Sequence, residues 1–199
     1  MCFNEQVSIT TYIVGIIGCI NLYFNYNLKV EAIFLAWIVQ IQLIEYFLWT
    51  NQSCNQDNIN VTKVGIIINH LQPVVLWFSI LLLSTYELPD YVNGIMVVYL
   101  LFTYFYTKNV FVDNCTLKEK NHLIWQWNLG EYKEIYYLFF LLCIDLLLIN
   151  GVDNGKIFAI LATVSYILSV IIYGNEKSIG SMWCFFGAFI PWILPFIKG

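Results

Sequence analysis

Several amide and ionisable side chains lie inside apolar segments of this chain. Residues 37–49 read WIVQIQLIEYFLW and residues 66–77 read IIINHLQPVVLW. A charged side chain at the centre of a membrane-spanning helix costs roughly 2.5–3.5 kcal/mol on insertion scales, so such a residue indicates a functional site by default. The polar residues of these two segments that could bind a cation or a polar solute are Gln42, Glu45, Asn69, His70 and Gln72.

The polar positions of three segments fall at a similar depth. Gln42 and Glu45 are three residues apart and share a helical face, and Glu45 lies about five residues, or ~7 Å, from the end of its segment. Asn69 lies about seven residues, or ~10 Å, from the same side. The last apolar segment begins GSMWCFF on that side and brings Ser181 and Cys184. We therefore expect one polar cluster between these three segments.

Prolines interrupt two of the three segments. Pro73 has no N–H to donate to the carbonyl group of Asn69, so it predicts a kink and a freed carbonyl beside the cluster. Pro191 and Pro195 predict further kinks in the last segment. Discontinuous helices of this kind line the substrate sites of many transporters.

The polar cluster also has a purely structural interpretation. Polar side chains bond between membrane helices at ~0.6 kcal/mol on average, so the cluster could serve only to fix helix packing. Asp145, in LLCIDLLLIN, has two interpretations as well. It is either a second station on a proton or cation path, or a side chain that reaches water or pairs with Lys156.

Catalysis is the minority interpretation. The chain has two histidines, which is too few for a typical hydrolytic zinc site, and it carries none of the HExxH, GxSxG, Walker A or GxGxxG patterns. We assign no catalytic residue, no metal and no cofactor. A net charge of −4, with lysine as the only strongly basic residue type, excludes nucleic acid as an expected partner.

The composition predicts a membrane protein. The chain is 60% hydrophobic and 11% charged, with a mean hydropathy of +0.71. We expect a single all-α domain over residues 1–199, a polytopic transmembrane helical bundle, with six spans as the alternative to seven. The seven segments long enough to cross ~30 Å are 8–24, 31–50, 63–84, 91–107, 132–150, 155–173 and 181–197.

With seven spans, one face of the bundle carries both long loops, 51–62 and 108–131, the N-terminus and the turn 174–180. We call it the loop face. Three N-x-S/T sequons and the pair Cys54 and Cys115 fall there, which favours a lumenal or extracellular side and a possible disulfide. Most of the lysines also lie there, and they favour the cytoplasmic side. In the second loop, His122, Trp125 and Trp127 are expected to anchor the chain at the membrane interface.

The segments QLIEYFLW, INHLQPVVLW and GSMWCFF together resemble a group of uncharacterised multi-pass membrane proteins encoded by large DNA viruses of protists and algae. The resemblance implies no activity. It adds a host endomembrane or the internal membrane of a virion to the plasma membrane as expected locations.

Two functional classes fit these patterns. The first is a small carrier or channel for a cation, a proton or a small polar solute, with the bilayer and that solute as its partners. The second is a structural or assembly membrane protein without transport activity.

Overall fold

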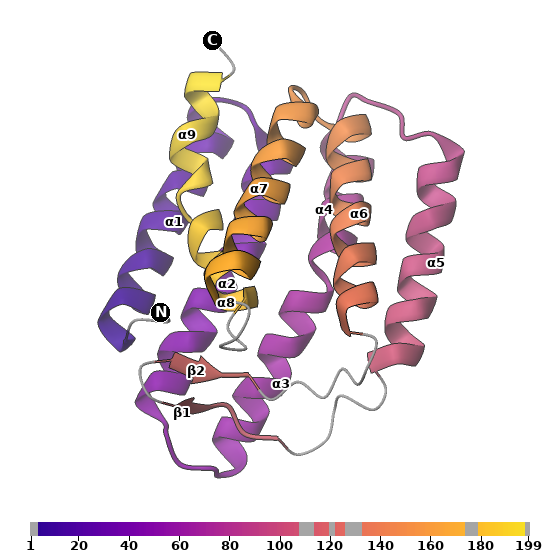
Figure 1. Cartoon of the computed structure of the whole chain (residues 1–199). Coiled ribbons are helices and arrows are strands. Elements are labelled where there is room, and N and C mark those ends of the chain that lie inside the picture. Colours follow the sequence, from indigo (N-terminus) through magenta and orange to yellow (C-terminus); the bar gives the residue numbers. More distant parts are fainter. Residues whose placement is uncertain (1–3, 108–113, 120–121, 126–132, 174–178, 198–199) are drawn as a thin grey trace.

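A computed structural model describes residues 4–107, 114–119, 122–125, 133–173 and 179–197. The chain folds into a bundle of roughly aligned helices with a small hairpin of strands at one end (Figure 1). The helices are α1 (Glu5–Asn25), α2 (Lys29–Thr50), α3 (Gln56–His70), α4 (Gln72–Leu83), α5 (Asp90–Thr107), α6 (Lys133–Gly151), α7 (Gly155–Tyr173), α8 (Ile179–Gly187) and α9 (Ile190–Ile197). The strands are β1 (Leu117–Glu119) and β2 (His122–Ile124), which pair antiparallel.

Helix α2 is the centre of the bundle. It packs against α1, α3, α4, α8 and α9, and apolar residues along its length, such as Phe34, Leu35 and Val39, are fully buried. At 22 residues α2 spans about 33 Å, close to the thickness of a bilayer's hydrocarbon core. The inward-facing side chains of α2, Gln42 and Glu45 among them, are therefore buried between the neighbouring helices.

Asparagines set several helix boundaries. The side chain of Asn4 accepts a hydrogen bond from the Val7 N–H at the start of α1, and Asn55 accepts one from the Asn58 N–H at the start of α3. Asn27 and Asn154 take the left-handed conformation, with φ of 54° and 52°, in the turns before α2 and α7. Because of the cap at Asn55, α3 begins seven residues before the expected start of its span, inside the segment expected to be a loop.

Two helix pairs are broken by sharp bends. Helices α3 and α4 meet at 50° across Leu71, and α8 and α9 meet at 48° across the short link after Gly187. Pro73 lies at the start of α4 and Pro191 at the start of α9, where the missing N–H groups are tolerated. Pro195 lies inside α9, which continues past it. A break therefore accompanies Pro73 and Pro191 but not Pro195.

The outward faces of the bundle are apolar. On α1, Ile13, Ile17, Ile20 and Phe24 follow one another at helical spacing and are half or more exposed, and α7 presents a similar stripe that ends at Ile171. A soluble monomer rarely exposes apolar patches on this scale, whereas lipid tails would cover them. The polar residues Gln42 and Glu45, in contrast, are buried. This distribution suits a protein associated with a membrane.

Among the described residues, three helices are long and apolar enough to cross a membrane: α1, α2 and residues 155–172 of α7. The number rises to five if each bent pair forms one span. Helix α5 and the described apolar part of α6, Ile135–Gly151, fall short of the same criteria. The helical bundle is confirmed, and by length and composition it holds three to five candidate membrane spans among the described residues.

Candidate functional site

The predicted polar residues gather at the break between α3 and α4. Helix α2 contributes two of them, the broken pair three, and α8 two, and all seven are almost fully buried. They are Gln42, Glu45, Asn69, His70, Gln72, Ser181 and Cys184. We call this set the polar cluster.

Contacts within the polar cluster join three elements. Gln72 directs its Nε2 atom toward the Asn69 Oδ1 atom at 3.5 Å and the Cys184 Sγ atom at 3.7 Å, which connects the break to α8. Gln42 donates from Nε2 to the Ser181 carbonyl group at 3.5 Å, which connects α2 to α8. Glu45 lies three residues from Gln42 on the same face of α2 and is likewise buried. The contacts are long, and the hydrogen bonds among them are weak.

Side chains from other parts of the bundle hold the backbone around the break. Trp37 of α2 donates from Nε1 to the Ile68 carbonyl at 2.8 Å, and Tyr99 of α5 donates its hydroxyl to the His70 carbonyl at 2.7 Å. The His70 Nδ1 atom lies 2.7 Å from the Ile66 carbonyl, so that nitrogen carries the proton. Sequence reasoning missed Trp37 and Tyr99. What could have identified them is an aromatic ring with a hydrogen-bond donor inside an apolar segment.

Two amide atoms at the break have no hydrogen-bond partner among the described residues. They are the donor Nδ2 of Asn69 and the acceptor Oε1 of Gln72. Both side chains are at most 1% exposed, and more than nine in ten buried polar groups in proteins are satisfied. The break therefore holds one buried donor and one buried acceptor without a partner among the described residues.

Asp145 occupies a separate place. Its Oδ2 atom accepts a hydrogen bond from the Thr163 hydroxyl at 2.8 Å, which joins α6 to α7, and its Oδ1 atom is buried. The side chain is half-buried, while Lys156 is exposed at the start of α7. No group of three or more His, Cys, Asp or Glu side chains that could hold a metal ion occurs in the described part of the chain.

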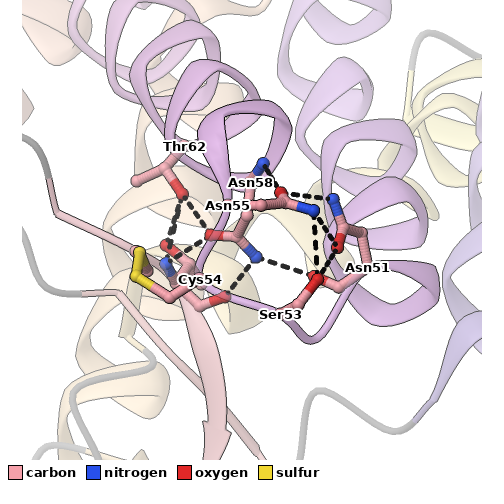
Figure 2. The surroundings of a disulfide bond; sticks show 8 residues. Asn51, Ser53, Cys54, Asn55, Asn58 and Thr62 are labelled. Atoms are coloured by element: carbon pink, nitrogen blue, oxygen red, sulfur yellow. Dashed lines mark hydrogen bonds between the residues drawn. A yellow bond between two sulfur atoms is a disulfide. The ribbon is translucent and has the colours of Figure 1, made fainter.

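The hairpin and the loop before α3 form a cap at the loop face. We use the term cap for residues 51–55, 114–119 and 122–125. Cys54 and Cys115 are joined by a disulfide, with their Cα atoms 5.5 Å apart. Beside it, the fully buried Asn58 donates from Nδ2 to the carbonyl groups of Asn51 and Thr116, at 2.8 and 3.0 Å, and accepts from the Thr116 N–H at 3.0 Å (Figure 2).

Trp125 is buried, which corrects the expectation that it anchors the loop at the membrane interface. Its ring lies over Gly65 of α3, where an added Cβ atom would be 2.7 Å away, and it packs with Ile44 and Leu48 of α2. Its Nε1 atom donates to the Ser181 hydroxyl at 2.8 Å. His122 is half-buried in β2, and Trp127 lies outside the described residues.

Comparison of the chain with protein-family models, with curated proteins and with solved structures gives no match.

Proposed function

We propose that this chain is a multi-pass integral membrane protein that binds and moves a cation, a proton or a small polar solute through the polar cluster. One observation carries the proposal. At the bend between α3 and α4, the Asn69 and Gln72 side chains are buried and leave one donor and one acceptor without a partner among the described residues. Burial of unpaired polar atoms is costly, and a bound solute would recover the cost.

Each part of the polar cluster has a separate role in this proposal. Glu45 supplies a negative charge that attracts a cation or carries a proton. Asn69 and Gln72 contact the solute through their unpartnered amide atoms. Bends at both broken helices provide places where the helix segments can change their relative angle, as the discontinuous helices of transporters do.

The disulfide supports an orientation. Cys54 is exposed, and a disulfide at such a position persists in oxidising compartments and is reduced in the cytosol. We therefore place the loop face on the lumenal or extracellular side, against the distribution of lysines. The proposed locations are a host endomembrane, the internal membrane of a virion, which the resemblance to viral membrane proteins suggests, and the plasma membrane. We also propose that α5 and α6 cross the membrane, which gives seven spans.

Flux measurements in reconstituted liposomes test transport directly. The probes are protons followed with a trapped pH dye, Rb⁺ and Na⁺ uptake, and swelling in urea or glycerol. We expect at least one probe to cross faster than in empty liposomes, and Glu45→Gln to reduce that flux about ten-fold or more, since its charge is lost. The matched control is Gln40→Leu, because the Gln40 amide donates to the Ala36 carbonyl of its own helix and Gln40 is not part of the polar cluster. If no probe crosses faster than in empty liposomes, the proposal is wrong.

A structural role is the second candidate, and one observation favours it. Trp37 and Tyr99 donate to carbonyl groups around the break, so the bend is also a junction that ties α2 and α5 to the broken pair. Gln72→Met separates the two functions, because it keeps the shape of the side chain and removes its polar atoms. Removing the unsatisfied acceptor stabilises the fold, while loss of the long donor contact to Asn69 Oδ1 destabilises it, so the thermal stability should change little. Loss of flux in a variant with unchanged stability supports transport, whereas loss of stability supports the structural role.

A further inference from the structure

An aromatic side chain, Trp125, lies on the loop-face side of the polar cluster. Trp125 lies between the three elements that supply the cluster: it contacts Ile44 of α2, Gly65 of α3 and Ser181 of α8. Ser181 belongs to the cluster, and Gln42 donates to its carbonyl group. The indole ring therefore packs against all three elements that supply the cluster.

Three attachments hold this ring in place from the other end of the cap. The disulfide ties Cys115, just before β1, to Cys54 in the loop before α3. The Asn58 amide bonds to both the N–H and the carbonyl of Thr116. The Gln52 side chain also accepts from the Lys118 N–H of β1 at 2.6 Å. Because β1 pairs with β2, and Trp125 follows β2 directly, these attachments fix the position of the ring.

We infer that the cap is a disulfide-held lid on the polar cluster, with Trp125 as its plug, and that reduction of the disulfide opens access to the cluster from the loop face. This inference rests on the proposed function of the cluster. The exposed Cys54 is the point of attack for a dithiol reductant.

The exchange takes two steps. A reductant thiolate forms a bond to the Cys54 sulfur, and the Cys115 sulfur leaves as a thiolate that takes up a proton. The second thiol of the reductant then displaces Cys54. Two electrons pass from the dithiol to the protein, which gains two thiols.

Cys184 provides a reporter within the cluster, since its thiol is free and fully buried. A background that retains only Cys184 and the disulfide is made by Cys2→Ser, Cys19→Ala and Cys143→Ala. The protein is placed in lipid nanodiscs and exposed to a positively charged methanethiosulfonate, and the adduct is followed by mass spectrometry. The disulfide is removed by Cys54→Ser with Cys115→Ser, so that no new thiol competes for the reagent.

We expect Cys184 to react slowly with the disulfide intact and at least about ten-fold faster without it, because a reagent reaches a buried thiol only through local opening. Trp125→Ala should have the same effect with the disulfide intact. The matched control is Trp77→Ala, since Trp77 bonds to Asn93 on α5, away from the cap. Equal rates with and without the disulfide, or no acceleration by Trp125→Ala, would overturn the inference.

A second reporter separates opening of the lid from general loosening. Cys143 lies on α6 and is fully buried and away from the cap. In a second background, Cys143 replaces Cys184 as the one free cysteine. We expect its reaction rate to stay the same when the disulfide is removed. Equal acceleration at Cys143 would mean that the whole bundle has loosened, and the lid would be refuted. The labelling needs no transport, so a failure of flux and a failure of the lid are seen in different measurements.

Discussion

Replacement of Asn58 by aspartate exchanges the side-chain NH2 group for an oxygen atom and so removes the hydrogen-bond donor. The Asn58 amide donates to the Asn51 and Thr116 carbonyl groups and accepts from the Thr116 N–H. A carboxylate retains only the acceptor role. It would face two carbonyl oxygens at the positions where the amide donated, in a residue that is 0% exposed.

The size of the effect follows from these contacts. In Asn58→Ala, the buried Thr116 carbonyl loses its donor, while the Thr116 N–H keeps the Thr62 hydroxyl at 3.2 Å. We expect a loss of about 2 kcal/mol in the free energy of unfolding. In Asn58→Asp, an uncompensated buried charge costs ~3–5 kcal/mol, and its place in the first turn of α3 returns ~0.3–1 kcal/mol through the helix dipole. The net loss is therefore about 2–5 kcal/mol.

The pH dependence distinguishes the two variants. Burial raises the pKa of the new carboxyl group above its usual value of about 4, so the folded state binds more protons than the unfolded state between these two pKa values. Stability of Asn58→Asp should then fall as the pH rises through that range, whereas the deficit of Asn58→Ala should stay constant. Lowering the pH from 7.5 to 4.5 should narrow the gap between Asn58→Asp and the unmodified chain.

Thermal unfolding in detergent, followed by tryptophan fluorescence, measures both effects. A loss of 3 kcal/mol corresponds to about 6–12 °C in Tm for a chain of this size. The control is Asn60→Asp, which adds the same charge at an exposed position two residues further along α3 and should change stability by less than about 0.5 kcal/mol. The reasoning is refuted if Asn58→Asp is as stable as Asn58→Ala at pH 7.5, or if its deficit does not depend on pH.

Three further predictions concern the cap and the opposite face of the bundle. Gly65→Ala places a Cβ atom 2.7 Å from the Trp125 ring and should cost ~1–3 kcal/mol, most of it recovered with Trp125→Leu in a double-mutant cycle by thermal unfolding. A hydrogen bond to Asp153, together with the negative charge of that residue, raises the pKa of the exposed Tyr86. Asp153→Asn should lower this pKa. The titration of Tyr86 is obtained by subtracting the tyrosine absorbance titration of Tyr86→Phe. The hydrogen bond that Tyr86 donates should be intact below about pH 10 and lost as the pH rises through the raised pKa. The disulfide joins residues 61 apart, and its loss should lower the free energy of unfolding by at most about 4 kcal/mol on the chain-entropy model. The loss is smaller if helices of the unfolded chain stay in the membrane. A dithiol should lower the Tm of the unmodified chain and leave the Tm of the variant without the disulfide unchanged.

The local features of the fold could be predicted from the sequence because each depends on neighbouring residues. Apolar runs long enough to cross a bilayer predict the helices. Pro73 and Pro191 predict breaks, because a missing N–H acts within one helical turn. Pro195 shows the limit of this reasoning: it lies within the last helix without a break after it. The polar residues of three segments could be identified by their type and depth, and the structure brings them together around α2.

Interactions between distant segments were decided by the tertiary structure. Nothing near Trp125 in the sequence indicates that its ring lies on Gly65 and bonds to Ser181, and an aromatic loop residue is equally suited to the membrane interface. Likewise, Tyr99 reaches the backbone at the break from α5.

The sequence by itself determined that this chain forms apolar helices, where two of them bend, and which residues carry polar groups into the apolar segments. Periodicity, hydropathy and proline chemistry all act over a few residues, so a short stretch of sequence is enough to predict their effects. Which atom of Asn69 or Gln72 is left without a partner depends on the side chains that α2 and α8 place beside the break. Only the folded chain fixes those distances, because hydrogen-bond partners separated by more than a hundred residues are chosen by packing.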